Sequence, residues 1–247
     1  MNIHQNFFNL DGKVALIAGS SRGIGFAFAE SLKNQNVKVI GLSRKKNINT
    51  NSDIHYVCNV TKQSNLKSIR TIFEKINIKL DIIIFAAGIT NLDNNLNDEK
   101  KFINTINTNL ISNYNFINTF KPIMNKNASV INISSINAIQ GFPQNPGYIA
   151  SKGGVEALTR SLAVDLGKQK IRVNCIRPGY IKTDMTLNSY NNPKKYRLRK
   201  KRTILKRWGS PNDLVGPMLL LASDASSYMT GSILTVDGGW SSLGLEE

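Results

Sequence analysis

The sequence predicts an α/β fold in which helices cover both faces of a parallel sheet. Short apolar runs rich in β-branched residues alternate with longer helix-like stretches along the 247-residue chain, which is the pattern of such folds. The runs are apolar almost throughout, as in strands that are buried on both faces. No linker rich in Pro, Gly or Ser interrupts the alternation. We therefore expect one domain over residues 1–247.

The elements follow from this alternation in chain order. Each short apolar run is expected to form a strand, and the longer mixed stretch after it is expected to form a helix. The expected strands are residues 14–18, 37–42, 54–58, 81–86, 129–134, 171–177 and 233–236. The expected helices are residues 24–34, 63–76, 102–124, 148–166 and 212–222.

Composition favours a cytoplasmic protein. The hydrophobic content of 41% is ordinary for a globular chain, and no stretch is long and apolar enough to span a membrane. Residues 1–10 are polar and lack the pattern of a secretory signal. Cys58 and Cys175 lie in apolar, strand-like contexts without metal-ligand spacing. We interpret them as reduced core thiols and expect no metal site.

The net charge of +16 is unusually high. Such a charge suits nucleic acid, a membrane surface or an acidic substrate. A second explanation is a solvated, lysine-rich surface, because Lys, Asn and Ile are frequent along the whole chain. A dense basic run stands out at residues 193–202, and Lys206 and Arg207 follow it.

A glycine-rich turn follows the first expected strand, with the spacing G-x-x-x-G-x-G. Such a turn between a strand and a helix lets the backbone approach a pyrophosphate, which then lies at the helix N-terminus. Glycines in a tight turn are weak evidence alone, but this one follows the first strand of an alternating pattern. The candidate cofactor-binding residues here are Gly19, Ser21, Arg22, Gly23, Ile24 and Gly25.

The turn after the second expected strand indicates which dinucleotide would bind. This turn normally meets the adenosine ribose, and an acidic residue there would repel a 2′-phosphate. The chain instead has Ser43 and Arg44, followed by two lysines. Arg22 would add a planar, bidentate contact to the phosphate. The pattern favours NADP(H), against the alternative of a generic basic loop.

A tyrosine and a lysine four residues apart, Tyr148 and Lys152, fall in the expected helix 148–166. Residues i and i+4 lie on one helix face. A nearby lysine cation is expected to lower the phenol pKa from near 10 and so assist proton transfer. Ser135 ends the strand before this helix, at the edge where ligands of open parallel sheets bind. Its hydroxyl would hold a carbonyl oxygen while Tyr148 supplies the proton.

These motifs, in this order and spacing, resemble the short-chain dehydrogenase/reductase family in its compact form. The resemblance extends from Leu10 to Trp240. It implies a Rossmann-type doubly wound seven-stranded sheet in the order 3-2-1-4-5-6-7. It also implies a homotetramer built by pairing residues 102–124 and 148–166.

The resemblance also implies roles for individual residues. Tyr148 would be the general acid, Ser135 would orient the carbonyl, and Lys152 would bind the nicotinamide ribose. Asn109 matches the family's proton-relay asparagine best, with Asn107 as a rival. Further cofactor contacts are implied for Asn59, Val60, Ala87, Gly88, Pro178, Gly179, Ile181 and Thr183.

Substrate specificity is expected in the loops beyond the strand ends. The segment from 184 to about 208 resembles the family's substrate lid, and it carries the basic run. Asn137, Gln144, Asn145 and Tyr180 are the substrate-binding candidates, beside Ser135 and Tyr148. Their polarity favours a sugar, sugar acid or polyol, in a free, phosphorylated or nucleotide-linked form. The alternative is a 3-oxoacyl thioester on acyl carrier protein.

Functions of other classes remain as alternatives. A non-catalytic NADP(H)-binding sensor would not need the intact group of Ser135, Tyr148 and Lys152. A nucleic-acid binder is disfavoured because Tyr196 is the one aromatic residue within the run at 193–202 and no recognition motif accompanies it. A dehydratase or epimerase would need a larger C-terminal substrate region. The expected activity is NADP(H)-dependent interconversion of a ketone and a secondary alcohol.

Overall fold

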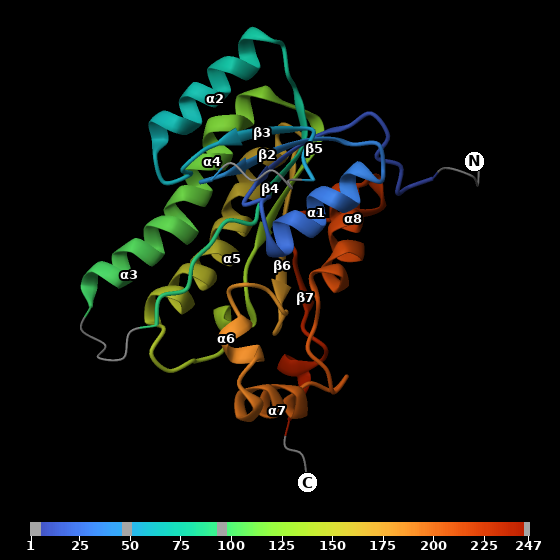
Figure 1. The fold of residues 1–247 in the computed structure, drawn as a ribbon. Coiled ribbons are helices and arrows are strands. Elements are labelled where there is room, and N and C mark those ends of the chain that lie inside the picture. Colours follow the sequence, from blue (N-terminus) through green and yellow to red (C-terminus); the bar gives the residue numbers. More distant parts are fainter. Residues whose placement is uncertain (1–5, 46–50, 93–97, 245–247) are drawn as a thin grey trace.

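The strands form one parallel sheet, as predicted. We describe a computed structural model that covers residues 6–45, 51–92 and 98–244. Its sheet has the order β3-β2-β1-β4-β5-β6-β7 (Figure 1), and every strand pairs in parallel with its neighbours. The strands are β1 Val14–Ala18, β2 Lys38–Ser43, β3 Ile54–Val57, β4 Leu80–Phe85, β5 Met124–Ile133, β6 Arg172–Pro178 and β7 Ile233–Val236.

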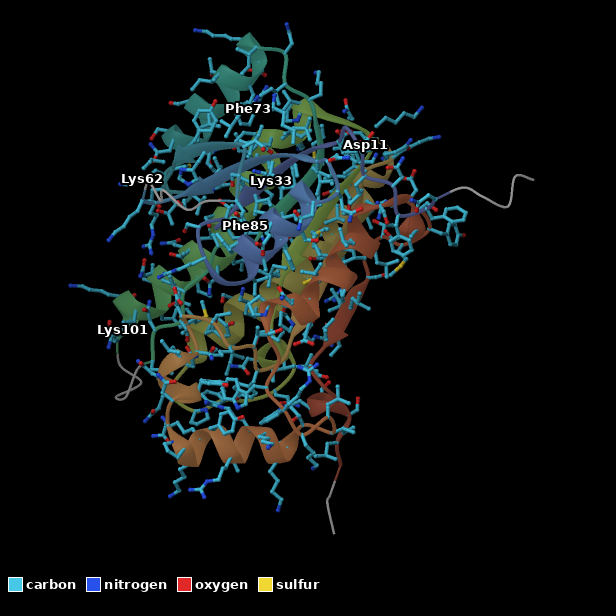
Figure 2. All side chains as sticks on the ribbon, turned by 45° about the vertical axis from the view of Figure 1, so that its right-hand side comes forward. Asp11, Lys33, Lys62, Phe73, Phe85 and Lys101 are labelled. Carbon is cyan, nitrogen blue, oxygen red and sulfur yellow. The ribbon has the colours of Figure 1, made fainter. Side chains whose placement is uncertain are left out.

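Helices cover both faces of this sheet. On one face α1 and α8 pack against Ile17, Ile82 and Ile131, and on the other α2, α4 and α5 cover Leu16, Ile83 and Val130. Phe73 of α2 and Phe85 of β4 are buried between the sheet and the helices on this second face, whereas Lys62 and Lys101 point outward (Figure 2). The helices are α1 Gly23–Lys33, α2 Gln63–Lys75, α3 Glu99–Ile106, α4 Ser112–Phe120, α5 Pro146–Gly167, α6 Leu187–Tyr190, α7 Pro193–Arg202 and α8 Val215–Ala222.

The expected helix at 102–124 is the largest difference from the sequence prediction. It consists of α3, a π-helical segment at Asn107–Ile111 and α4, and Met124 already belongs to β5. Pro122 lies in the 3-10 turn Lys121–Ile123 after α4, where it lacks the N–H that a continuing helix would need. The π-helical segment places Asn109 on the site side of the helix, and such segments are frequent at functional sites.

The expected lid contains two helices that sequence patterns did not predict. α6 and α7 lie below the carboxyl ends of the strands (Figure 1). At the start of α7 the Asn192 side chain accepts a hydrogen bond from the Lys195 backbone N–H (3.0 Å), which satisfies a free helix donor. An isolated β-bridge between Ile181 and Gly209 joins the two ends of the lid. The segment therefore leaves the sheet shortly after β6 and returns to nearly the same place at Gly209.

Neither cysteine is available for a disulfide. Cys58 and Cys175 are free and buried. Burial raises the pKa of Cys58 to about 11 and that of Cys175 to about 12, so both thiols stay protonated at neutral pH. Within the described residues, no helix has the length and apolar character that crossing a membrane requires.

Candidate active site

Ser135, Tyr148 and Lys152 meet at the carboxyl end of β5. Ser135 follows this strand directly, while Tyr148 and Lys152 lie in the first turns of α5. Pro146 occupies the start of α5, where its missing N–H costs nothing and its fixed φ favours the helix. The strand end and the helix start thus bring the hydroxyl, the phenol and the ammonium together.

The pKa of Tyr148 differs from the sequence expectation. Burial raises the pKa of the phenol, and a hydrogen bond with the Ser135 hydroxyl offsets only part of this effect. The expected lowering by Lys152 is absent because the ammonium does not contact the phenol oxygen. Instead, Lys152 Nζ donates to the Ile133 carbonyl oxygen at 2.8 Å and lies 5.6 Å from the centroid of the Tyr148 ring. Tyr148 is therefore protonated at neutral pH and suited to donate a proton.

Lys152 is held in a buried position. It is 6% exposed, and burial lowers its pKa to about 8. The Ile133 carbonyl fixes the position of the ammonium, because Lys152 Nζ donates to that oxygen. A partly titrating ammonium beside a tyrosine can stabilise the phenolate that remains after proton donation.

Asn109 reaches the same site from the π-helical segment. Its amide exchanges hydrogen bonds with the Ile89 backbone (2.8 and 2.9 Å) and donates to Ser151 Oγ at 3.0 Å. A Cβ atom on Gly88 would lie 3.4 Å from Asn109 Oδ1 and 3.7 Å from Lys152 Nζ. Asn109 is 1% exposed, whereas Asn107 is exposed. The geometry therefore favours Asn109 over its rival.

A buried ion pair lies one helical turn beyond Lys152, and sequence reasoning missed it. Arg177 on β6 contacts both carboxylate oxygens of Glu156 at 2.7 Å, and the Ser134 hydroxyl donates to Glu156 at 2.8 Å. This hydrogen bonding raises the pKa of Arg177. The signal was present in the sequence, because Tyr148, Lys152 and Glu156 repeat at i, i+4 and i+8 and so share one helix face.

The glycine loop has the close backbone contacts that a bound pyrophosphate needs. Gly19 has φ +85°, and a Cβ atom there would stand 2.7 Å from the Ala87 backbone nitrogen. Gly23 has φ +57°, and a Cβ atom on Gly25 would collide with the Gly19 carbonyl oxygen. These positions require glycine, because a side chain would occupy the space or strain the backbone. Ser21 and Ile24 lie in the same loop, half-buried beside the start of α1.

The end of β2 lies beside a histidine that the sequence analysis did not select. Ser43 Oγ donates to the Lys45 carbonyl oxygen at 2.7 Å and lies 2.8 Å from His55 Nε2. Burial lowers the pKa of His55. Arg44 is exposed, whereas Arg22 forms an ion pair at 3.5 Å with Asp184 of the lid. Lys46, the last cation of the expected phosphate contact, lies outside the described residues.

The other expected cofactor residues line the strand ends around this loop. Asn59 Oδ1 accepts from the Thr61 hydroxyl (2.9 Å), and Val60 is buried. A Cβ atom on Gly23 would lie 3.6 Å from Thr183, so the end of β6 adjoins the glycine loop. The remaining residues fall at the ends of β4 and β6, namely Ala87, Gly88, Pro178, Gly179 and Ile181.

The expected substrate residues differ in their placement. Asn145 is 4% exposed, and its Nδ2 donates to Thr90 Oγ1 at 2.8 Å, while its buried Oδ1 has no partner among the described residues. Asn137 donates its backbone N–H to Ser135 Oγ (3.2 Å). Gln144 is exposed, with φ +60°. Tyr180 lies close enough to Tyr148 to raise its pKa electrostatically.

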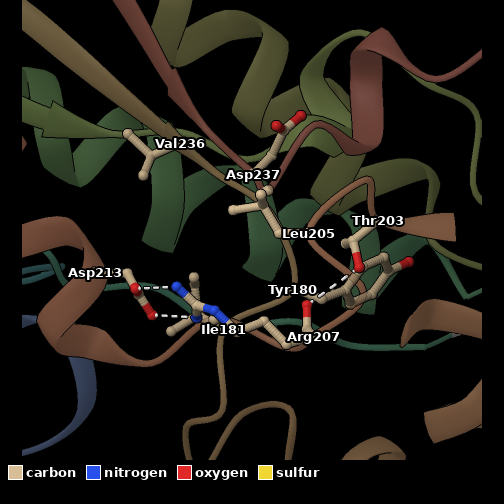
Figure 3. A pocket seen from close by; sticks show the side chains of 10 residues that line it. Tyr180, Ile181, Thr203, Leu205, Arg207, Asp213, Val236 and Asp237 are labelled. Atoms are coloured by element: carbon tan, nitrogen blue, oxygen red, sulfur yellow. Dashed lines mark hydrogen bonds and ion pairs between the residues drawn. The ribbon is translucent and has the colours of Figure 1, made fainter. Parts of the chain in front are cut away.

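A pocket lies near Ser135, Tyr148 and Lys152, but none of these three residues lines it. Figure 3 shows it between the end of the lid and β7, with Thr203 and Leu205 on one side and Asp237 on another. Arg207 and Asp213 close one wall through two hydrogen bonds of 2.6 and 2.9 Å. Tyr180 and Ile181 line this pocket, and Tyr180 also lies close enough to Tyr148 to raise the pKa of its phenol.

This arrangement fits a nicotinamide dinucleotide on the glycine loop and a carbonyl substrate at Tyr148. The fit rests on the Gly19, Gly23 and Gly25 geometry, because glycine at these positions permits the tight turn that leads from β1 into the N-terminus of α1. The fold and the site define an α/β dinucleotide-binding oxidoreductase.

Comparisons with known proteins agree with this class. A family model described as enoyl-(acyl carrier protein) reductase matches residues 18–241. The chain is 35% identical over 245 residues to 3-oxoacyl-[acyl-carrier-protein] reductase FabG of Chlamydia trachomatis, covering 93% of this chain and 98% of that protein. It is 33% identical over 247 residues to 2-dehydro-3-deoxy-D-gluconate 5-dehydrogenase of Dickeya dadantii, covering 95% and 98%.

A solved structure adds to this likeness. The gluconate 5-dehydrogenase of Burkholderia cenocepacia, in complex with NADP and tartrate, superposes with a TM-score of 0.89 at 27% identity, covering 96% of this chain and 98% of that chain. The chain belongs to the short-chain dehydrogenase/reductase family.

Proposed function

We propose that this protein is an NADP(H)-dependent oxidoreductase that interconverts a ketone and a secondary alcohol. The observation that carries the proposal is the meeting of Ser135, Tyr148 and Lys152 at the carboxyl end of β5. A sensor without catalysis would have no use for a buried lysine next to a protonated phenol. The family also contains enzymes whose names state this type of reaction.

In the proposed reduction, Ser135 and Tyr148 both contact the substrate carbonyl oxygen. A nicotinamide dinucleotide, which Gly19, Gly23 and Gly25 would admit at the start of α1, would supply the hydride for the carbonyl carbon. Tyr148 donates its phenolic proton to the carbonyl oxygen, so the C=O double bond becomes C–OH. Lys152, held by the Ile133 carbonyl, stabilises the phenolate. Asn109 fixes the Ile89 backbone next to Lys152, where a relay that returns the proton from solvent would begin.

The preference for NADP(H) rests on the charge at the end of β2. Ser43 and Arg44 offer a hydroxyl and a guanidinium to a 2′-phosphate, and this turn carries no acidic residue to repel it. The gluconate 5-dehydrogenase of Burkholderia cenocepacia has NADP bound. Arg22 would leave Asp184 to add a further contact, which an ion pair of 3.5 Å between exposed side chains permits.

A hydroxylated sugar acid is the proposed substrate, within the wider class of sugars and polyols. Asn137 follows Ser135 in the same loop and donates its backbone N–H to the Ser135 hydroxyl, and the buried Asn145 Oδ1 has no partner among the described residues. Polar groups of this kind suit hydroxyls more than an aliphatic chain. Relatives named for 2-dehydro-3-deoxy-D-gluconate and for gluconate share this fold and length.

The second candidate activity is reduction of a 3-oxoacyl thioester on acyl carrier protein. A specific observation favours it, since the last turn of α7 carries Arg199, Lys200, Lys201 and Arg202. Such a surface suits an acidic carrier. The Chlamydia trachomatis relative bears this activity in its name.

We also propose a cytoplasmic homotetramer. Exposed apolar side chains lie along the long helices, with Phe102, Ile103, Ile111 and Tyr114 on the α3–α4 path and Val164 on α5. Apolar surface of this kind marks protein–protein contacts. Light scattering is expected to give the mass of four chains, and a stable monomer at assay concentrations would contradict the proposal.

Cofactor titration followed by a substrate panel tests the proposed function. NADPH and NADH binding would be compared by fluorescence, and then turnover of keto-sugars, keto-acids and acetoacetyl thioesters would be assayed. The proposal expects tighter NADPH binding and turnover of a keto-acid or keto-sugar. Turnover of the thioester alone would select the second activity, and better binding of NADH would contradict the interpretation of Ser43 and Arg44.

A further inference from the structure

Arg199 lies within an aromatic enclosure formed by the lid and the substrate loop. Its guanidinium carbon lies 4.4 Å from the ring centroid of Tyr180, 5.7 Å from that of Trp208 and 5.9 Å from that of Phe142. These rings come from three segments: the loop between β5 and α5, the end of β6, and the end of the lid. The guanidinium therefore sits where segments far apart in sequence meet.

This enclosure lies beside Tyr148, the proposed proton donor. Tyr180 is close to both Arg199 and Tyr148. It also meets Trp240 edge-on, with ring centroids 4.7 Å apart, and Trp240 Nε1 donates to Gln140 Oε1 at 2.8 Å. A substrate whose carbonyl lies at Tyr148 would therefore extend along Tyr180 toward Arg199.

Arg199 carries a charge that the described residues do not neutralise. Its Nη1 atom is buried and has no hydrogen-bond partner among them. Other carboxylates near the site are engaged elsewhere, since Asp213 pairs with Arg207, Asp184 pairs with Arg22, and Asp237 accepts from Gly239 and Ser241. A buried donor without a partner is costly, and a guanidinium remains charged at every physiological pH.

Ring contacts alone do not account for this arrangement. Aromatic rings stabilise a cation lying over them, but they accept no strong hydrogen bond from the N–H groups at its edge. Other arginines of this chain have hydrogen-bond partners: Arg177 and Arg207 each form a two-point contact with a carboxylate, and the buried Arg172 donates to two backbone carbonyls and the Ser226 hydroxyl. Arg199 has the same fork and no such partner among the described residues.

We propose that Arg199 binds the carboxylate of an acidic substrate, at the end remote from the reacting carbonyl. This inference rests on the proposed function and assigns a binding residue to the carboxylate of the sugar acid proposed there. A guanidinium and a carboxylate match as a planar two-point pair. The half-buried Arg199 balances the single charge of a carboxylate, while Arg202 is exposed and its guanidinium lies over the neighbouring Trp240 ring, 5.0 Å from the centroid.

Binding of matched ligands tests the inference without requiring turnover. The full chain, saturated with NADP⁺, would be titrated in a calorimeter with D-gluconate, D-glucitol and D-glucitol 6-phosphate. The first two differ only in a carboxylate against a hydroxymethyl group. We expect the unaltered protein to prefer gluconate over glucitol, and Arg199→Met to lose about tenfold or more in gluconate affinity while its glucitol affinity changes little.

Two further variants separate charge from folding. Arg199→Lys keeps the charge without the fork and is expected to recover part of the gluconate preference. Lys194→Met removes an exposed cation from the first turn of α7 and is expected to leave all three affinities unchanged. If Arg199→Met disrupted the lid, both gluconate and glucitol would bind less well. In that case the ratio of gluconate affinity to glucitol affinity in Arg199→Lys would show whether the side chain at position 199 selects the carboxylate.

Several outcomes would overturn the inference. The first is that the unaltered protein binds gluconate and glucitol equally well. The second is that the ratio of gluconate affinity to glucitol affinity is the same in Arg199→Met and Arg199→Lys as in the unaltered protein. The third is that Arg199 contributes more to the affinity for glucitol 6-phosphate than to the affinity for gluconate. Reduction of a neutral diketone, assayed in parallel, reports on Ser135, Tyr148 and Lys152 alone. Its absence would contradict the proposed function while leaving the binding result for Arg199 valid.

Discussion

Two regions of this molecule hold their charged groups in opposite ways. At the sheet edge, Lys152 and Glu156 are buried, and each is bonded to a fixed partner on the neighbouring strands. In the lid, α7 carries cations in its last turn with no buried residue along its length, as the nitrogen-tipped side chains around this helix in Figure 2 illustrate. The difference separates side chains that the core holds in place from cations on a surface segment. We propose that the first group carries out the reaction and that the second takes part in substrate selection.

Removing the proton donor gives the largest expected effect. In Tyr148→Phe the ring remains, so NADPH binding is retained, but the proposed proton donor is lost. Turnover is expected to fall by about 10²- to 10⁴-fold. Steady-state kinetics beside a fluorescence titration of NADPH check both parts, and near-normal turnover would remove Tyr148 from its proposed role.

The buried Glu156–Arg177 pair and the more exposed Asp213–Arg207 pair are expected to contribute differently to stability. Glu156→Gln would leave Arg177, whose side chain is 16% exposed, without its charge partner, and we expect the free energy of unfolding to fall by about 3 kcal/mol. The matched change in the lid region, Asp213→Asn, breaks a pair whose arginine is 54% exposed and is expected to shift the urea midpoint much less. Equal midpoint shifts in the two variants would contradict the contrast.

Cofactor preference is expected to respond to the end of β2. Ser43→Asp would place a carboxylate where a 2′-phosphate is proposed to bind, and it would lose the contact between Ser43 Oγ and His55. We expect NADPH affinity to fall by about tenfold or more, with a smaller change for NADH. Arg44→Ala is the milder companion variant, and a parallel loss of both cofactors would indicate a structural role for this turn.

The pH dependence of reduction gives the smallest effect. Since burial lowers the pKa of Lys152 to about 8, its positive charge is present below that pH and lost above it. Initial rates at saturating NADPH should therefore fall severalfold as the pH rises through 8. The contribution of Lys152 to the free energy of unfolding rises as the pH increases above 8, because the unfolded chain keeps the lysine proton up to a higher pH than the folded chain does. A flat rate profile between pH 7 and pH 9 would contradict the proposed charge requirement.

The sequence predicted the sheet and the proximity of Tyr148 and Lys152 because both depend on short-range patterns. Buried runs and the i, i+4 spacing of Tyr148 and Lys152 are local features, and β1 and β7 have the expected bounds. Properties that depend on tertiary packing could not be read in this way. Burial reverses the expected pKa shift of Tyr148, and the contact of Ser43 with His55 requires the β2–β3 register. The enclosure of Arg199 requires three loops to meet.

Rapid mixing of the NADPH-loaded protein with a panel of carbonyl compounds tests the central claim most directly. We expect that a hydroxylated keto-acid oxidises bound NADPH in a single turnover, and that Tyr148→Phe binds the same NADPH without oxidising it. NADPH that binds tightly but is oxidised by no keto-acid, keto-sugar or acetoacetyl thioester would contradict the assignment of Ser135, Tyr148 and Lys152 to carbonyl chemistry.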